Sequence, residues 1–584
     1  MRVVVLGGYG VFGSRLCRLL ARDGHAVWIA GRRRDRAAAL ARDLGPNAYA
    51  LVVDRTGDPD AALAVDPDVI VDAAGPFGTY ADLGDPYRVA RLCVRHGIDY
   101  LDLSDDAGFT AGIAVLDAEA RSAGCRVLSG ASSVPGLSSA AVAELSRGMT
   151  SILRIDGAIL PGNRAPRGAS VIAGIVAQLG RPLRVWHGGR WREERAWGAA
   201  RRIALAPDLV RRGRMIAVPD LALFPSAFGA RSVTFHAGLE LRALDLGLRV
   251  LAAIRRVWPF AVTPGRAAAL RRLAALTEPF GSDRGGMRVA VVGTLPDAPS
   301  PVEREWRLVV EGGDGPFVPG VVCRAVLRRL ERDPGSMPPG ARPAIAAVSL
   351  AEAEAAMADL AARTDRRARA HPALFQTVLG PHWDGLPPAL RALDDVHDQE
   401  TFTGAARVVR GRTWRARLVA AVFGFPPAGD DVPVQVTKTR TETPRGPAET
   451  WERRFGPHAF RSRLAAGDAT DRVTGQIEER FGPFAFDLAL SPEGTGLRWT
   501  LLRGRCLGCP LPAWLLPKTD TREGVDGGVF RFDVALFAPL GGGLIVRYEG
   551  WLRPDADRDG QRAANGSHPG QTNRPRSERL QAGR

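Results

Sequence analysis

The feature that most constrains the fold is a glycine-rich loop near the start of the chain, placed between an apolar run and a helix-like stretch. The run Val3–Leu6 leads directly into Gly7, Gly8, Tyr9, Gly10, Val11, Phe12 and Gly13, which contain the spacing G-x-G-x-x-G. In a strand–loop–helix unit, Gly8 permits a tight turn, Gly10 lets the backbone approach a pyrophosphate, and Gly13 allows the helix to pack closely on the strand. The helix N-terminus that follows favours an anion. The sequence therefore predicts that these seven residues bind a dinucleotide.

The rest of residues 1–130 alternates short apolar runs with helical stretches, a rhythm typical of βαβ units in a parallel sheet. Predicted strands are Arg2–Leu6, Ala26–Ala30, Ala48–Val53, Val69–Asp72, Tyr100–Leu103 and Arg126–Ser129. Predicted helices are Gly13–Arg22, Asp35–Leu44, Pro86–His96 and Val115–Ala123. We expect an α/β fold here, a Rossmann doubly wound parallel sheet.

The end of the second predicted strand indicates which dinucleotide is bound. In NAD-binding proteins an acidic residue about 20 residues past the glycines contacts the adenosine ribose. This chain has Arg32 and Arg33 there instead, and arginine can pair with a 2′-phosphate. NADP is therefore favoured over NAD. Asp54, after the third predicted strand, is placed either to meet the adenine edge or to form a turn.

Two further domains and a tail follow. Residues 131–368 mix strands, such as Ile152–Ile159 and Ser232–Leu241, with helices, which predicts an α+β substrate or dimerisation domain. Its last predicted helix, Leu350–Arg363, follows a turn at Pro338–Gly340 and either returns to the Rossmann domain or leads into a linker. From 371 to 553 most of the chain reads as strands separated by turns, which predicts a β-rich antiparallel domain. Residues 554–584 are polar and are predicted to be disordered.

Several segments resemble the saccharopine dehydrogenase-like family of NADP-binding oxidoreductases. They are the glycine loop, Ala73–Phe77, Gly97–Leu103 and Ser132–Gly136, in the expected order. The resemblance implies that Gly75, Pro76 and Phe77 line the nicotinamide side of the cofactor and that a substrate domain packs over the sheet. Residues 371–553 resemble a bacterial domain of unknown function, DUF4166, through Ala373–Phe375, Gly404 and Pro510–Pro512.

Composition limits the partners. The net charge of +16 would suggest nucleic acid, but Lys438 and Lys518 are the only lysines and the arginines are scattered, so no nucleic-acid partner is expected. The chain shows neither a secretion signal nor an apolar run of the ~18 residues that span a bilayer, and a cytoplasmic location is expected. Six cysteines are few for 584 residues, and Cys506 and Cys509 lack further ligands nearby, so no metal site is expected.

The sequence does not decide which surface one predicted helix contacts. Residues 241–258 carry apolar residues at helical spacing with arginines alongside. This helix either packs on the second domain or on a second copy in a homodimer, or it lies on an anionic membrane surface.

The catalytic group is not identified by sequence. The first 437 residues contain no lysine, which excludes the Tyr-x-x-x-Lys pair of short-chain dehydrogenases. Asp102, Ser104, Asp105 and Asp106 are candidates for handling a proton, each equally suited to a cap or turn. We expect an NADP-dependent oxidoreductase that transfers a hydride between nicotinamide and a small carbonyl, imine or enoyl substrate. The alternative is a non-catalytic NADP-binding sensor or carrier whose C-terminal domain binds an apolar ligand.

Overall fold

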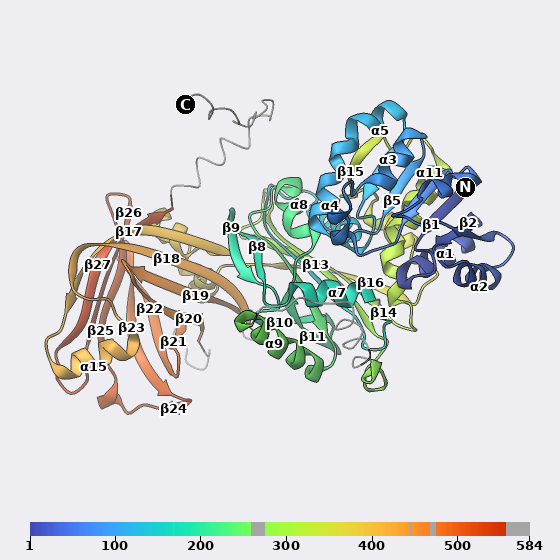
Figure 1. Ribbon diagram of the computed structural model, residues 1–584. Helices are drawn as coiled ribbons and strands as arrows, with labels where there is room; N and C mark the ends of the chain where they lie inside the picture. Colours follow the sequence, from blue (N-terminus) through green and yellow to red (C-terminus); the bar gives the residue numbers. More distant parts are fainter. Residues whose placement is uncertain (167–168, 259–271, 273–274, 444–445, 468–474, 556–584) are drawn as a thin grey trace, which may run out of the picture. The chain divides into compact units, whose positions relative to one another are not determined.

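The structure is a computed structural model that describes the chain except residues 167–168, 259–271, 273–274, 444–445, 468–474 and 556–584 (Figure 1). It divides into two compact units, Met1–His371 and Pro372–Arg584.

The first unit contains a parallel sheet of seven strands in the order β15-β6-β5-β4-β1-β2-β3. Their bounds are β1 Arg2–Leu6, β2 Ala26–Gly31, β3 Ala48–Val52, β4 Val69–Asp72, β5 Asp99–Asp102, β6 Arg126–Ser129 and β15 Gly340–Pro343. The predicted Rossmann sheet is thereby confirmed, with β5 shifted by one residue. The seventh strand, β15, pairs in parallel with β6 and was missed, because its Pro338–Gly340 approach reads as a turn.

Eight α-helices accompany this sheet. They are α1 Val11–Arg22, α2 Arg34–Leu44, α3 Arg88–Arg95, α4 Ala107–Gly112, α5 Asp117–Ala123, α6 Ser138–Leu145, α11 Val321–Arg332 and α12 Leu350–Ala355. The predicted helix Val115–Ala123 is only partly right, since a 3-10 turn at Ile113–Leu116 precedes α5. The chain therefore fills the connection between β5 and β6 with three short helical pieces.

The second sheet of this unit has nine strands, of which β10-β11-β12-β7-β13-β14-β16 form the main path and β8 and β9 attach beside β12. The strands are β7 Ser151–Leu160, β8 Pro182–His187, β9 Arg190–Arg195, β10 Ala200–Ala206, β11 Leu209–Met215, β12 Val233–Leu239, β13 Gly285–Thr294, β14 Val302–Val310 and β16 Ala362–Ala370. With α7 Ala169–Gln178, α8 Pro219–Phe228 and α9 Arg242–Val257, they form the predicted α+β part.

One hydrophobic core joins both sheets. Val3 and Leu16 of the Rossmann part, Trp306 of β14 and Leu350 of α12 belong to the same buried cluster. Leu350 is thus buried in a core that both parts share, and the return of this segment to the Rossmann part stays a prediction. The limits 1–130 and 131–368 stay predictions.

The predicted helix Leu350–Arg363 is wrong in its second half. α12 ends at Ala355, and Ala362–Ala370 forms edge strand β16 instead. Alanine and arginine favour helix locally, but β16 pairs along its length with β14 and its Arg369 lies 2.7 Å from the Glu303 carboxylate of that strand. Tertiary pairing thus overrides local propensity.

Helix α9 uses its two faces differently. Leu248, Leu251 and Ala252 pack against Leu179 and Trp197, which confirms packing on the second domain. The opposite face exposes Leu246, Val250, Ile254, Val257 and Trp258. A homodimer contact stays a prediction.

The second unit is a closed antiparallel barrel, orange and red in Figure 1. Its strands are β17 Gln399–Arg410, β18 Gly429–Thr443, β19 Gly446–Phe455, β20 His458–Ala466, β21 Gln476–Phe481, β22 Phe484–Glu493, β23 Gly496–Cys506, β24 Cys509–Pro510, β25 Lys518–Asp526, β26 Val529–Phe537 and β27 Leu544–Pro554. β17 pairs with β27 and β22 with β23, so ten strands close the ring and β24 extends from β23. Helices α13 Leu374–Leu379, α14 Pro388–Asp394 and α15 Trp414–Phe423 accompany it.

The predicted β-rich antiparallel domain is confirmed. The predicted tail lies, from residue 556 onward, outside the described residues. Within the described ranges, none of the helices has the length and apolar character needed to cross a bilayer.

A buried ion cluster links three helices of the first unit. The guanidinium of Arg324 on α11 lies 2.7 Å from Asp23 after α1 and also pairs with Asp359 after α12. Although burial opposes it, hydrogen bonds from Arg324 and Arg328 lower the pKa of Asp23 to about 2. Arg324 itself is only 2% exposed. Its loss would remove the buried guanidinium that joins Asp23 to Asp359, although Asp23 would keep Arg328 and the exposed Asp359 would keep Arg22.

Arg324→Ala is therefore expected to lower the free energy of unfolding of the first unit by about 2 kcal/mol, the order of the charged hydrogen bonds that are lost. Denaturant unfolding followed by circular dichroism measures the change. Arg332→Ala, on the same helix but with a side chain 70% exposed, is the matched control and should change stability by less than about 0.5 kcal/mol. Equal effects of the two substitutions would contradict the role given to Arg324.

Candidate functional site

The candidate site lies at the carboxyl ends of the parallel strands, where open α/β sheets bind ligands. The loops after β1, β2, β4, β5 and β6 meet at this edge, since all these strands run in the same direction. It is built entirely from residues of the first unit.

The glycine loop after β1 is packed too tightly for side chains. Gly7 has φ +69°, and a Cβ there would lie 2.9 Å from Ala74 Cα. A Cβ on Gly8 would lie 2.8 Å from the Val5 carbonyl oxygen, and one on Gly13 would overlap the Gly7 carbonyl. The close packing assigned to Gly13 is thus observed, whereas the positive φ of the turn falls at Gly7 and not at Gly8.

Helix α1 begins without a capping side chain. Gly10 is the N-cap residue, no side chain caps it, and no acidic residue lies in the first turn. The first N–H groups of a helix lack partners within the helix and attract anions. The backbone of Val11, Phe12 and Gly13 can therefore receive a pyrophosphate.

Tyr9 packs against the end of β2, where the two predicted arginines, Arg32 and Arg33, have different contacts. The Tyr9 ring lies against Gly31, where a Cβ would come within 2.7 Å of the hydroxyl, and this hydroxyl accepts a hydrogen bond of 3.1 Å from Arg33 N. The Arg33 side chain pairs with Asp35 at 2.9 Å. Arg32 is exposed and, within the described residues, forms no side-chain hydrogen bond or ion pair. Arg32 is thus the one available for a 2′-phosphate.

Asp54 has a local role. Its Oδ1 accepts hydrogen bonds from Thr56 N at 3.0 Å and Thr56 Oγ1 at 2.9 Å, and these bonds lower its pKa. The sequence left two roles open for Asp54, contact with the adenine edge or formation of a turn. These hydrogen bonds form a turn.

Gly75, Pro76 and Phe77 follow β4. Gly75 and Pro76 are exposed, whereas the Phe77 ring is buried and packs against Tyr80 and Phe109 at centroid distances of 5.4 and 5.2 Å. Any contact of Phe77 with a ligand would therefore be made by its backbone.

A polar cluster that the sequence did not predict holds the turn after β4 in place. Asp72, at the end of β4, accepts hydrogen bonds from Arg55 Nε and from Ala74 N at 3.0 Å. The Arg55 guanidinium lies 3.3 Å from the centroid of the Tyr80 ring, and the Tyr80 hydroxyl donates to the Ala74 carbonyl. No spacing in the sequence could have linked Arg55 to Asp72, because Arg55 lies in the loop after β3 and Asp72 ends strand β4.

The four candidates for proton handling, at the end of β5 and in the loop after it, differ in their hydrogen bonds. Asp102 accepts hydrogen bonds from Gly130 N, Ser104 N and Ser129 Oγ at 2.7 to 3.0 Å, and burial raises its pKa to about 7. Asp106 caps α4 by accepting from Phe109 N at 2.8 Å. Ser104 bonds Thr110 and Asp106 N. These three groups hold the loop, although the buried Oδ2 of Asp102 has no hydrogen-bond partner among the described residues.

Asp105 differs from its neighbours. It is exposed, and among the described residues no other side chain hydrogen bonds to its carboxylate. Desolvation by the surrounding protein, together with the nearby Asp106 carboxylate, raises its pKa. Asp105 is therefore the carboxyl group at this edge that a substrate could reach.

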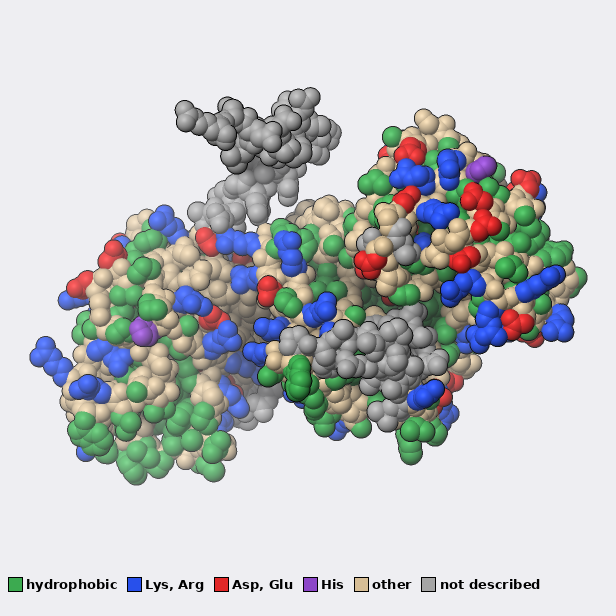
Figure 2. Space-filling view, viewed as in Figure 1, with side chains coloured by type: hydrophobic (Ala, Val, Ile, Leu, Met, Phe, Trp, Pro, Cys, Tyr) green, Lys and Arg blue, Asp and Glu red, His purple; other side chains and the backbone are tan. Residues whose placement is uncertain are grey.

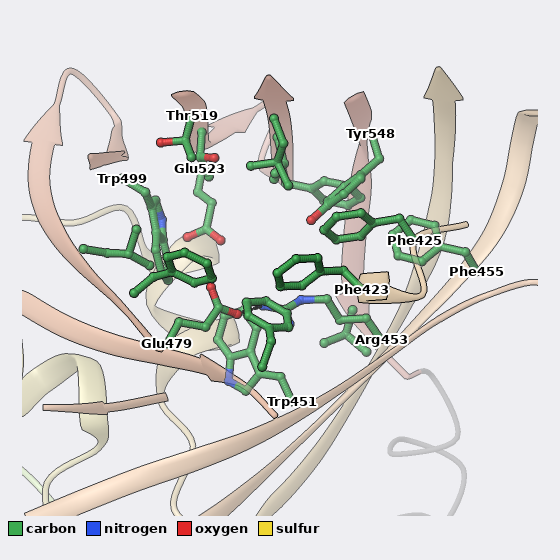
Figure 3. Close-up of a pocket in the computed structure, with 18 of the residues that line it drawn as sticks. Phe423, Phe425, Trp451, Arg453, Phe455, Glu479, Trp499, Thr519, Glu523 and Tyr548 are labelled. Atoms are coloured by element: carbon green, nitrogen blue, oxygen red, sulfur yellow. Dashed lines mark hydrogen bonds and ion pairs between the residues drawn. The ribbon is translucent and has the colours of Figure 1, made fainter. Parts of the chain in front are cut away.

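The second unit contains a separate cavity inside the barrel (Figure 3). It holds about 1250 Å³ of empty space, including the solvent at its opening, and aromatic and aliphatic side chains dominate its lining. Phe423, Phe425, Trp451, Phe455 and Trp499 are among them. The barrel therefore offers room for a small organic molecule.

Basic side chains on the face drawn in Figure 2 are scattered among acidic and apolar ones.

The cysteines are free thiols, with Cys506 half-buried and Cys509 exposed. In the described part of the chain, no group of three or more His, Cys, Asp or Glu side chains is arranged to hold a metal ion.

Comparison with known proteins identifies two segments. Residues 3–128 match the model of the saccharopine dehydrogenase NADP-binding domain, and residues 386–552 match the domain of unknown function DUF4166. No curated protein matches the chain.

Solved structures show limited similarity. Saccharopine dehydrogenase (L-Glu forming) from Saccharomyces cerevisiae is 14% identical, with 63% of this chain and 100% of that chain covered and a TM-score of 0.45. Sorbitol-6-phosphate 2-dehydrogenase from Erwinia amylovora is 22% identical over 22% of this chain and 69% of that chain, with a TM-score of 0.19. 3-Hydroxyacyl-CoA dehydrogenase type-2 from Mycobacterium avium is 26% identical over 22% of this chain and 72% of that chain, also with a TM-score of 0.19.

The family matches agree with the glycine loop and with the barrel of the second unit. The N-terminal segment of this chain is therefore similar to the saccharopine dehydrogenase NADP-binding domain, with NADP as the indicated cofactor, and its C-terminal segment is similar to DUF4166.

Proposed function

We propose that the protein is an NADP-dependent oxidoreductase that transfers a hydride between nicotinamide and a small carbonyl, imine or enoyl substrate. The observation that carries the proposal is the free Asp105 carboxylate, which lies at the same sheet edge as the glycine loop. A cofactor loop alone would serve a binding protein equally well, whereas a reachable acid beside it suits catalysis.

The residues at the sheet edge fit the cofactor. The cradle formed by Gly7, Gly8 and Gly13 would be filled by any Cβ, and α1 has no capping side chain to compete with a pyrophosphate. Arg32 would meet the 2′-phosphate that distinguishes NADP from NAD. NADPH, when bound, supplies the hydride.

Asp105 would hold the proton that balances hydride transfer. Addition of a hydride to a carbonyl or imine carbon leaves an oxygen or nitrogen that must gain a proton. The raised pKa of Asp105 favours the protonated carboxyl that can give it. Asp102 is less suited, because it is fully buried and holds three hydrogen bonds.

A second candidate function is that of an NADP-binding sensor or carrier. The barrel cavity favours it, since an apolar ligand could be held there without any reaction. Turnover of NADPH with a member of a substrate panel separates the two functions.

The charge of Arg32 should set the cofactor preference. Arg32→Asp removes the partner of the 2′-phosphate and places a carboxylate where NAD-binding proteins have one. We expect the affinity for NADPH to fall by about 10-fold or more, the order of a lost charge-assisted hydrogen bond, while the affinity for NADH is kept or improved. Titration followed by nicotinamide fluorescence measures both.

Arg42→Asp is the matched control, because it makes the same charge change at the far end of α2. It should leave the ratio of the two affinities unchanged. If Arg32→Asp also leaves the ratio unchanged, Arg32 does not contact the 2′-phosphate.

Asp105→Asn tests the proton-handling role. Loss of a general acid commonly lowers kcat by about 100-fold or more, and we expect that loss with little change in KM. In the direction of reduction the wild-type rate should fall as pH rises through the pKa of Asp105, because the carboxyl then loses its proton. The variant should lack this limb of the pH profile. NADPH oxidation with aldehydes, ketones, cyclic imines and enoyl compounds is the assay.

Asp106→Asn provides the control at the next position, since asparagine caps a helix about as well as aspartate. It should keep nearly wild-type kcat and the same pH profile. Wild-type kinetics in Asp105→Asn would remove Asp105 from the mechanism. NADPH binding without reduction of any panel member would favour the sensor or carrier.

A further inference from the structure

Two of the polar groups on the wall of the barrel cavity lie on neighbouring strands. Trp499 lies on β23 and Glu523 on β25, and these strands pair so that Leu497 is opposite Glu523 and Trp499 is opposite Thr521. Side chains two residues apart on a strand share one face, so Trp499 and Glu523 point to the same side. Figure 3 shows both directed into the cavity.

Both groups contain a buried polar atom that makes no well-formed hydrogen bond. Trp499 Nε1 and the Glu523 carboxyl lie close enough for the indole to lower the pKa of Glu523, but neither Trp499 Nε1 nor Glu523 Oε2 makes a hydrogen bond of good geometry within the described residues. Trp499 as a whole is only 5% exposed. Buried polar groups in folded proteins are nearly always hydrogen-bonded. An indole N–H and a carboxyl oxygen that face a cavity are therefore placed to bond to a molecule inside it.

The charged groups on the cavity wall neutralise one another. Arg453 Nη2 lies 3.0 Å from Glu479 Oε1, and Lys438 Nζ lies 2.6 Å from Asp394 Oδ1. Lys438 also donates to the Leu393 carbonyl and lies 3.8 Å from the centroid of the Trp451 ring. No cation among the described lining residues is left to pair with an anionic ligand.

Glu523 favours its uncharged form. Burial and the nearby Asp394 carboxylate raise its pKa, which favours the protonated carboxyl. A protonated carboxyl can both donate and accept a hydrogen bond. The polar end of the cavity thus suits an uncharged oxygen atom, while the aromatic lining suits an apolar body.

We propose that the barrel binds an uncharged, mainly apolar molecule through a hydroxyl or carbonyl oxygen, which accepts a hydrogen bond from Trp499 Nε1 and shares a second one with the Glu523 carboxyl. This site does not depend on NADP chemistry, so the failure of either proposal leaves the other standing. Fatty acids and other anions are excluded as good ligands, because their carboxylate would find no free cation.

The test uses the full chain and the uncharged fluorescent probe N-phenyl-1-naphthylamine. Excitation of tryptophan should give energy transfer to the bound probe, since Trp451 and Trp499 line the cavity. Displacement is then compared for three molecules of equal chain length: 1-decanol, decane and decanoate. We expect 1-decanol to displace the probe at a concentration about 10-fold or more below that of decanoate.

Trp499→Phe removes the N–H and keeps an aromatic ring. It should weaken binding of 1-decanol by about five- to tenfold, the order of one hydrogen bond, and leave the binding of decane unchanged. Glu523→Leu should also weaken the binding of 1-decanol and not that of decane. It replaces Trp499→Phe in the test if circular dichroism shows that Trp499→Phe does not fold. Trp514→Phe, at an exposed residue outside the cavity, should change neither.

Three results would overturn the proposal. The first is absence of probe binding to the folded protein. The second is stronger displacement by decanoate than by 1-decanol. The third is an equal loss of 1-decanol and decane binding in the two variants, because it would mean that Trp499 and Glu523 only shape the barrel.

Discussion

Direct contact between backbone segments at the glycine loop is the constraint on which the rest of the first unit depends. A side chain on Gly13 would overlap the Gly7 carbonyl, and one on Gly7 would press on Ala74 after β4. The first turn of α1 therefore rests on the loop after β1, and that loop rests on the turn after β4. This contact brings an uncapped helix N-terminus, Arg32 and the Asp105 loop to one edge of the sheet, where a dinucleotide and its substrate would meet.

A polar side chain at the sheet edge can bind a ligand only if it keeps an atom without a hydrogen-bond partner in the protein. Asp72 and Asp102 are buried and tie loops together, so they fix the geometry of the edge, although Asp102 does so through Oδ1 alone and its buried Oδ2 has no partner among the described residues. Arg32 and Asp105 hold no loop in this way within the described residues and are available to ligands. In the barrel, Lys438 and Arg453 are likewise occupied by ion pairs, whereas Trp499 Nε1 and Glu523 Oε2 make no well-formed hydrogen bond.

Local pattern was sufficient to predict the elements whose signal is contained in a short segment. The first six strands of the Rossmann sheet, the glycine loop and most barrel strands follow from apolar runs bounded by turns. β15 and β16 could not be found in this way, because each is defined by its pairing with a strand far away in sequence. The same holds within the site. Sequence reasoning named Asp102, Ser104, Asp105 and Asp106 without ranking them, and only the hydrogen bonds from Gly130, Ser129 and Phe109 show which are occupied. The orphaned atoms in the barrel likewise depend on how β23 pairs with β25.

A crystal structure of the full chain with NADP+ tests the central claim most directly. We expect the pyrophosphate to lie against the N-terminus of α1, Arg32 to contact the 2′-phosphate, and the nicotinamide end to lie at the edge that carries Gly75 and Asp105. A nucleotide bound elsewhere, or one bound at this edge with Arg32 turned away and Asp105 shielded from the nicotinamide, would contradict it.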